Sequence, residues 1–233
     1  MSPNLLFPRW NPQMLKKSII PFFILLFFPL FIHAASTEEI IRQVQAVYDG
    51  AKDVSSEFVQ KVRVAALEQD IEKKGTALFK KPGRLRVDYE GEEGRLYVSD
   101  SKKLWIYDKG DTQVNVYTVG PRTMPEEALA FLGGLGNLRA QFRVSAVSEN
   151  ERKTMKLNGS LDWLLLIPKN SESTLNELLL GFDRSTHTVG EAYLKNESGN
   201  LSHYFFQNVK LNSDLPDDSF VFVKPKGVRE IKN

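Results

Sequence analysis

The sequence predicts a mainly β protein, an antiparallel sheet accompanied by a few helices. Three observations predict this fold class. After about residue 50, short apolar or alternating runs are separated by turn residues at a spacing of roughly 8 to 12, which is typical of antiparallel architecture. The 233 residues are 42% hydrophobic and 26% charged, the composition of an ordinary globular chain. The part that follows residue 35 has the length of a single domain with a core of its own.

The first 35 residues are of a different kind. Residues 19–32 read IIPFFILLFFPLFI, and this uncharged run follows Lys16 and Lys17 and precedes small residues. Such an order is typical of a secretory signal peptide. A retained membrane anchor is the alternative, but a span needs about 20 apolar residues and two prolines interrupt this run. We expect residues 1–35 to be removed, with translation starting at Met1 or Met14, and residues 36–233 to form one domain.

Twelve runs have the apolar pattern and the flanking turn residues of strands. Turns such as Lys109-Gly110-Asp111 and Asn158-Gly159 separate them. The predicted strands cover residues 57–66, 75–80, 84–90, 96–99, 104–107, 113–119, 141–148, 161–168, 176–182, 189–195, 201–209 and 220–223.

Two helices are predicted besides the strands. Ser36-Thr37-Glu38-Glu39 fits a capping box, and apolar residues follow at helical spacing up to Gly50. A second capping box at residues 123–126 begins a short helix that Gly133-Gly134 ends. The apolar stripe of this second helix fits either a helix packed on the sheet core or a lid over a cavity. Its members are Met124, Ala128, Leu129, Phe131 and Leu132.

Apolar residues stand next to one another on both sides of one predicted turn. In LYVSDSKKLWIYD, residues 96–108, the runs LYV and LWIY are consecutive, whereas a strand with one wet face alternates. Both faces of this part of the sheet must therefore be covered. One set of side chains can line a hollow for an apolar guest, because burying each methylene of an acyl chain yields about 0.8 kcal/mol. The sequence leaves open which set faces inward. The candidate acyl-chain-binding residues are Leu78, Leu85, Val87, Tyr89, Tyr97, Trp105, Tyr107, Val116, Leu164 and Leu166.

Few residues suit catalysis or metal binding. The chain has no cysteine and none of the motifs GxSxG, SxxK or GxxxxGK[ST], so we expect no cofactor and no metal site. His187 lacks the partner histidine of a zinc motif, and His203 lies in a predicted strand. A lipid hydrolase using Ser99, Asp100 and His203 stays as an alternative hypothesis. Without residues 1–35 the charges nearly balance, which does not favour nucleic acid as a partner.

Several segments in sequence resemble the LolA family of outer-membrane lipoprotein carriers. The segment VSDSKKLWIYD at 98–108 is similar to the family signature VSDGKTLWIYDP. The segment GTALFKKPGRLRVDY at 75–89 is similar to the strands around the family pattern KRPGRFRW. FVQK at 58–61, LLLIPK at 164–169 and DDSFVFVKPKGV at 217–228 also match in order and spacing.

The resemblance implies an incomplete antiparallel β-barrel of about 11 strands, covered by an N-terminal helix and short lid helices. It implies a monomeric periplasmic chaperone without enzyme activity. Such a carrier takes acylated lipoproteins from an inner-membrane lipoprotein-releasing ABC transporter to an outer-membrane lipoprotein acceptor. The acceptor is itself a lipoprotein, so the lack of cysteine favours the soluble carrier. Met124, Leu129, Phe131 and Leu132 would belong to the lid.

One departure from the family pattern concerns a lid latch. The family has arginine before the proline of KRP, where it hydrogen-bonds lid carbonyls, and Lys81 stands at this position. Lysine keeps the charge but lacks the planar fork of donors, so the latch would be weaker or served by Arg84 or Arg86. The departure leaves open a carrier or sensor of another lipid or glycolipid.

Overall fold

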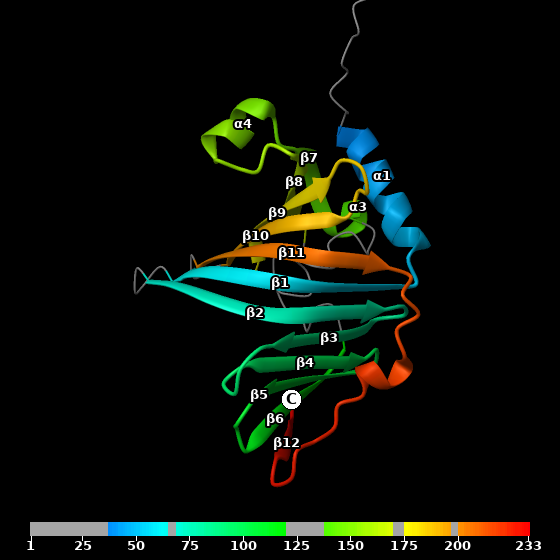
Figure 1. Cartoon of the computed structure of the whole chain (residues 1–233), viewed down its shortest axis with the longest axis vertical. Coiled ribbons are helices and arrows are strands. Elements are labelled where there is room, and N and C mark those ends of the chain that lie inside the picture. The colour runs from blue at the N-terminus through cyan, green and yellow to red at the C-terminus, as the bar shows by residue number, and fades with distance from the viewer. Residues whose placement is uncertain (1–36, 65–68, 120–137, 170–174, 197–199) are drawn as a thin grey trace, which may run out of the picture. The chain divides into compact units, whose positions relative to one another are not determined.

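The structure is a computed structural model that describes residues 37–64, 69–119, 138–169, 175–196 and 200–233. These residues belong to a compact unit spanning Ala35–Asn233. The predicted signal peptide, the predicted capping residue Ser36 and the predicted helix after residue 123 lie outside the described residues. The elements in chain order (Figure 1) are α1 Thr37–Gly50, β1 Asp53–Val64, β2 Gln69–Lys80, β3 Arg84–Tyr89, β4 Arg95–Asp100, β5 Lys103–Asp108, β6 Gln113–Thr118, α3 Leu138–Gln141, β7 Phe142–Ala146, α4 Glu149–Thr154, β8 Leu161–Pro168, β9 Leu175–Asp183, β10 Val189–Asn196, β11 Leu201–Leu211, the 3-10 helix η1 Asp217–Phe220, and β12 Arg229–Lys232.

All described strands form one 12-stranded sheet in the order β12-β6-β5-β4-β3-β2-β1-β11-β10-β9-β8-β7. Two meanders build it, because β1 to β6 and β7 to β11 each run in chain order and β1 pairs with β11 (Figure 1). Neighbouring strands are antiparallel except β12, which pairs parallel with β6. The edge strands β12 and β7 do not pair with each other, so the sheet is unclosed. This architecture confirms the predicted fold class.

The last predicted strand, at residues 220–223, is wrong. Asp217–Phe220 forms the 3-10 helix η1, and the backbone N–H of Val221 donates to the carbonyl of Asp218 at 3.1 Å. Phe220 is buried, whereas Val221 and Val223 are 55% and 80% exposed. The alternation of apolar residues here therefore reflects two phenylalanine anchors on the sheet and not a hydrogen-bonded ladder. The twelfth strand lies further on, at Arg229–Lys232.

Helix α1 forms where the capping box and the apolar spacing predict it. Its buried residues, Ile40, Ile41, Val44 and Tyr48, lie on one side of the helix and pack against the sheet. At its first turn, the backbone N–H of Ala146 on β7 donates to the hydroxyl of Thr37 at 3.2 Å. The helix is thus attached to the β7 edge of the sheet by hydrogen bonding as well as by apolar contact.

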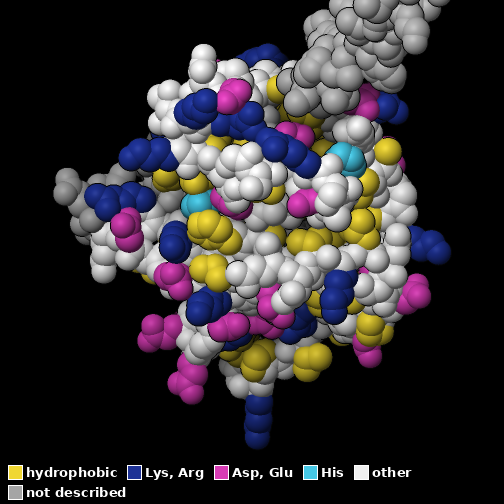
Figure 2. Space-filling model, turned by 45° about the horizontal axis from the view of Figure 1, so that its top comes forward, with side chains coloured by type: hydrophobic (Ala, Val, Ile, Leu, Met, Phe, Trp, Pro, Cys, Tyr) yellow, Lys and Arg dark blue, Asp and Glu magenta, His cyan; other side chains and the backbone are white. Residues whose placement is uncertain are grey.

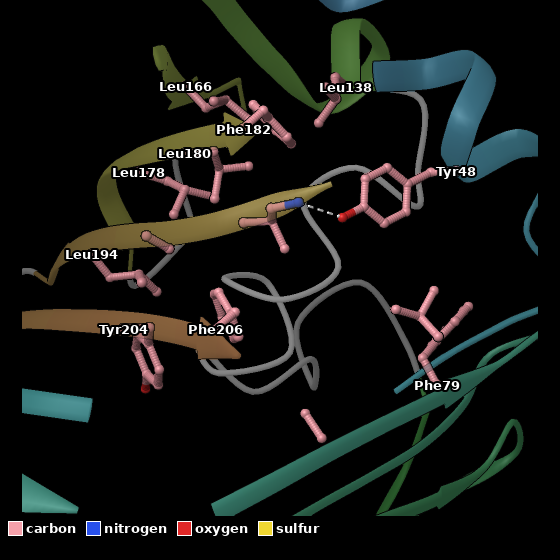
Figure 3. Close-up of a cluster of buried hydrophobic side chains, with 14 of the residues drawn as sticks. Tyr48, Phe79, Leu138, Leu166, Leu178, Leu180, Phe182, Leu194, Tyr204 and Phe206 are labelled. Atoms are coloured by element: carbon pink, nitrogen blue, oxygen red, sulfur yellow. Dashed lines mark hydrogen bonds between the residues drawn. The ribbon is translucent and has the colours of Figure 1, made fainter. Parts of the chain in front are cut away.

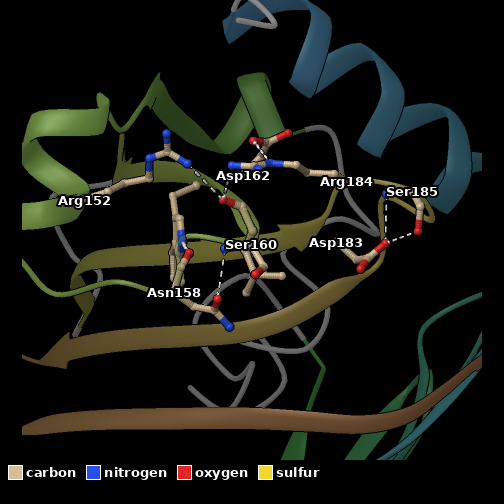
Figure 4. A network of polar contacts seen from close by, with 9 residues as sticks. Arg152, Asn158, Ser160, Asp162, Asp183, Arg184 and Ser185 are labelled. Carbon is tan, nitrogen blue, oxygen red and sulfur yellow. Dashed lines mark hydrogen bonds and ion pairs between the residues drawn. The ribbon is translucent and has the colours of Figure 1, made fainter.

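A second short helix, α4, begins with a capping box that the sequence interpretation missed. The hydroxyl of Ser148 accepts from the backbone N–H of Glu151, and the Glu151 carboxylate accepts from the backbone N–H of Ser148 at 2.8 Å. Arg152 donates from α4 to the carbonyl of Leu161 on β8, and Arg184 pairs with Asp162 at 2.9 Å (Figure 4). These contacts tie α4 and the β9–β10 turn to the end of β8.

Charged side chains of both signs are interspersed over the face drawn in Figure 2, with hydrophobic side chains between them. This face therefore lacks the single-sign patch that nucleic-acid binding requires. Among the residues that the structure describes, no helix is long and apolar enough to cross a membrane.

Candidate functional site

The candidate site is the face of the sheet that packs against α1, called here the inner face. Strand register assigns side chains to it, because successive residues of a strand point to opposite faces. In β3 the inner residues are Leu85, Val87 and Tyr89, which share the apolar cluster with the buried residues of α1. Side chains of the same cluster converge on one interior from β9, β10 and β11 (Figure 3). The inner face is therefore continuous from one meander to the other.

The ten candidate acyl-chain-binding residues do not share one face. Cross-strand pairing of Val87 with Tyr97, and of Leu164 with Leu180, places these residues on the inner face. Pairing of Leu78 with Arg86 and of Val98 with Trp105 defines the opposite, outer face. The six inner residues are Leu85, Val87, Tyr89, Tyr97, Leu164 and Leu166, and the four outer residues are Leu78, Trp105, Tyr107 and Val116. The sequence alone could not assign the faces, and the structure divides the ten residues between them.

The consecutive apolar residues of β5 have a partner on each side, as the sequence predicts. Leu104 and Ile106 join the inner cluster. Trp105 and Tyr107 pack on the outer face under the C-terminal segment, where the ring of Phe222 stacks on Trp105 with centroids 5.9 Å apart. The outer apolar residues of β5 therefore serve to hold the C-terminal segment on the sheet.

Lys81 contacts the end of α1. Its ammonium group donates to the carbonyl oxygens of Tyr48 and Asp49 at 2.8 and 2.9 Å. These carbonyls belong to the last turn of the helix, where backbone acceptors lack helical partners and a positive charge is favourable. At the other end of the Tyr48 side chain, the hydroxyl accepts from the backbone N–H of Val189 at 2.9 Å (Figure 3), and burial raises its pKa to about 12. α1 is thus fixed to both meanders.

Arg84 and Arg86, the expected substitutes for Lys81, have other partners among the described residues. Both alternate with the inner residues of β3 and so lie on the outer face. Arg84 pairs with Asp217 of η1 at 2.5 Å, and Arg86 donates to Asp88 at 3.1 Å. The predicted lid residues Met124, Leu129, Phe131 and Leu132 lie outside the described residues.

A polar belt crosses the inner face at the open end of β1, β3 and β11, and the sequence interpretation missed it. The hydroxyl of Tyr89 donates to the side-chain carbonyl of Gln60 at 2.8 Å, and the Gln60 amide donates to the hydroxyl of Ser202 at 3.2 Å. The Tyr204 hydroxyl lies 3.4 Å from that of Tyr89. Gln60 is in phase with Phe58 in the FVQK segment, and a large polar residue in this alternation was the available signal.

No metal centre and no hydrolase triad forms among the described residues. They contain no cluster of three histidine, cysteine, aspartate or glutamate side chains that could hold a metal ion. Ser99 lies on the inner face of β4 and donates to the carbonyl of Gly83, whereas His203 lies on β11 opposite Tyr193 of the outer face. Three strands separate β4 from β11, so Ser99, Asp100 and His203 do not come together.

These features define a single-sheet protein whose apolar inner face carries a helix along it. The family model described as "Outer membrane lipoprotein carrier protein LolA" matches residues 49–223, and the chain belongs to this family. The resemblance found in the sequence segments is thereby confirmed.

Relatives agree with this membership, and one solved structure shares the fold. The outer-membrane lipoprotein carrier protein of Chromobacterium violaceum is 27% identical over 195 residues, which cover 84% of this chain and 88% of the relative. The protein of the same name from Nitrosospira multiformis is 28% identical over 207 residues, covering 89% and 95%. An uncharacterized conserved protein from Thermus thermophilus shares the fold with a TM-score of 0.50 at 14% identity, covering 84% of this chain and 98% of that one.

Proposed function

We propose that the protein is a periplasmic carrier that binds the acyl chains of lipoproteins on its inner face and acts without enzyme chemistry. Family membership supports the class of cargo, because the relatives bear the name of lipoprotein carriers. The apolar run at residues 19–32 supports export, since it has the order of a signal peptide.

The width of the inner face is the observation that carries the proposal. Side chains of both meanders contribute to one apolar cluster. Strands lie about 4.8 Å apart, so eleven of them span on the order of 50 Å along the curve of the sheet. A helix with its side chains is only about 10–12 Å wide. Among the described residues, α1 and the single residue Leu138 of α3 are the helical contributions to this cluster. The described helices therefore account for only part of the cover over this face, and we assign the rest to the lid, which acyl chains would replace.

In the proposed cycle the lid exchanges with the acyl chains. Met124, Leu129, Phe131 and Leu132 form the stripe that would cover the inner face in the empty carrier. The acyl-chain site comprises Leu85, Val87, Tyr89, Tyr97, Leu164 and Leu166. In the empty carrier, Lys81 holds the C-terminal end of α1. Entry of acyl chains would loosen this end of the helix.

The proposed partners follow from the family. A monomer receives acylated lipoprotein from an inner-membrane lipoprotein-releasing ABC transporter and delivers it to an outer-membrane acceptor. Transfer between such partners needs no covalent step, because the acyl chains only exchange one apolar environment for another.

Release from membranes tests the proposed function. The purified protein is mixed with inner membranes that contain the transporter and an acylated lipoprotein, with ATP or with ADP. We expect acylated lipoprotein to leave the membrane with the protein only when ATP is present.

The matched control is the same cargo with its lipidated cysteine replaced by serine, which has no acyl chain. If a known carrier releases acylated cargo under these conditions and this protein releases none, or releases the unacylated cargo equally well, the proposed function is wrong.

A further inference from the structure

A hollow of about 1010 Å³ opens at the end of the inner face where the polar belt lies. Gln60, Tyr89 and Tyr97 of the inner face line its inner wall. Its outer wall consists of charged residues from the start of β2 and the turn between β3 and β4. Polar side chains of the inner face thus line one wall of the hollow, and charged side chains line the other.

Gln60 has an unused hydrogen-bond donor at this place. The residue is 6% exposed, and its side-chain amide nitrogen carries two hydrogens. One is donated to Ser202, while the side-chain oxygen accepts from Tyr89. The second hydrogen has no acceptor among the residues that the structure describes. A ligand oxygen in the hollow could accept this second hydrogen in place of water.

The rim of the hollow carries an excess of negative charge. Arg95 is neutralised by Asp108, with Nη2 and Oδ2 3.0 Å apart. Lys73 lies over the ring of Tyr89, with Nζ 5.8 Å from its centroid, and Lys74 is its neighbour. Against these two lysines stand four glutamates of the same rim, Glu72, Glu90, Glu92 and Glu93. A ligand head that carries phosphate would be repelled by this rim, whereas an uncharged head would not.

We propose that this hollow is a head-group subsite for the uncharged, carbonyl-bearing end of an acylated ligand, with the free N–H of Gln60 donating to an ester or amide carbonyl. The inference rests on the proposed function, because the acyl chains of the same ligand would lie on the inner face. It adds a substrate class: neutral acyl-glycerol or acyl-amide heads are preferred over anionic phospholipid heads.

Two lipids that differ only in the carbonyl test this subsite. Dipalmitoylglycerol has two ester carbonyls, and dihexadecylglycerol has ether links and none. Each competes with a pyrene-labelled fatty acid bound to the purified protein. We expect the ester lipid to bind about five-fold more tightly, the size of one hydrogen bond. Equal affinities of the wild-type protein for the two lipids would overturn the proposal without need of any variant.

Variants locate the donor. Gln60→Met has a similar shape and no N–H, and we expect it to bind ester and ether lipids equally. Ser202→Ala removes the other partner of the Gln60 amide and leaves the free N–H in place, so it should keep the ester preference. Retention of the preference by a folded Gln60→Met, or its loss in Ser202→Ala, contradicts the assignment of the donor.

The rim charges supply a second readout. Dipalmitoylglycerol should compete more strongly than dipalmitoyl phosphatidylglycerol, and the difference should shrink in high salt and in the variant Glu90→Gln/Glu92→Gln/Glu93→Gln. If the difference in affinity between the two lipids is unchanged in that variant, the rim charges do not cause the preference. If the wild-type protein binds neither the labelled fatty acid nor any of these lipids, the proposed function fails instead. If the protein binds all of these lipids with equal affinity, the head-group subsite is contradicted and the proposed function is not.

Discussion

The ammonium group of Lys81 donates to two carbonyl oxygens in the last turn of α1, those of Tyr48 and Asp49. No residue of the helix's own last turn is basic, so this contact from the turn between β2 and β3 supplies the positive charge there. The planar fork of an arginine is not needed to reach two neighbouring carbonyls, because an ammonium group has three donors.

Loss of these donors should loosen the end of α1. We expect Lys81→Met to lower the free energy of unfolding by about 1–2 kcal/mol, since each hydrogen bond from a charged group contributes and one of them is exposed. Lys81→Arg should lose less than half of that. Urea denaturation of the three proteins measures the difference, and a Lys81→Met variant as stable as the wild type would show that the contact is incidental.

His203 makes the stability of the protein depend on pH. Its ring lies between those of Tyr193 and Phe205, with centroid distances of 3.7 and 3.8 Å, and its Nε2 is 2.9 Å from the Glu191 carboxylate. Burial lowers the pKa of His203 below 6.5, and Lys61 adds to this, although Glu191 acts in the opposite direction. The unfolded chain therefore binds more protons than the folded one just below pH 6.5. The free energy of unfolding decreases as the pH is lowered through this range.

Replacing this histidine should remove that pH dependence. We expect the stability of His203→Gln to change less between pH 7.5 and about 5 than that of the wild type, because no side chain at position 203 then titrates. His187→Gln, a change in a turn, should keep the wild-type slope. The urea midpoint of each protein is measured at the two pH values. An equal change of midpoint in His203→Gln and in the wild type would contradict the prediction.

At the scale of elements, α4 depends on its capping box more than on its surface ion pair. Ser148→Ala removes the hydroxyl that caps the helix and should cost about 1 kcal/mol. Glu149→Gln removes the exposed pair with Lys153, 2.7 Å apart, and should change stability much less than Ser148→Ala does. Hydrogen exchange of the α4 amides measures both, and similar protection factors in the two variants would count against this ranking.

The strands themselves were largely predictable, and their faces were not. Alternation located β3, and the consecutive run of β5 correctly indicated two covered faces. Which of these faces packs on α1 depends on cross-strand register, which is set by partners far away in the chain, as in the pairing of β1 with β11. The start of β2 was missed because its first six residues are exposed on both faces and carry no apolar alternation. The polar belt was missed because its residues come from separate strands.

At the scale of the whole molecule, the two faces of the sheet have different roles. The outer face is covered by segments of the chain itself, by the C-terminal segment at one end and by Leu157 near the other. Among the described helices, α1 and Leu138 of α3 pack on the inner face. Ligand uptake should therefore respond to changes on the inner face and in the proposed lid alone.

The lid gives one test of this division. We expect Leu129→Glu or Phe131→Glu to lower uptake of a fluorescent acyl probe strongly while the fold stays intact, because a helix that faces a cavity tolerates a charge better than one in a packed core. Probe titration and circular dichroism are measured on the same samples. Global unfolding of both variants would instead indicate a helix packed permanently in the core.

Leu85 and Leu78 give the sharper test, because they lie on adjacent strands and on opposite faces. Leu85→Ala removes apolar contact from the proposed acyl-chain site and should weaken binding of the probe about ten-fold. Leu78→Ala removes the same atoms from the outer face and should leave the affinity unchanged, although both variants lose stability through the vacated volume. Comparing dissociation constants of the folded variants separates affinity from stability. Equal weakening by the two substitutions would mean that general loosening of the sheet, and not contact on the inner face, governs uptake.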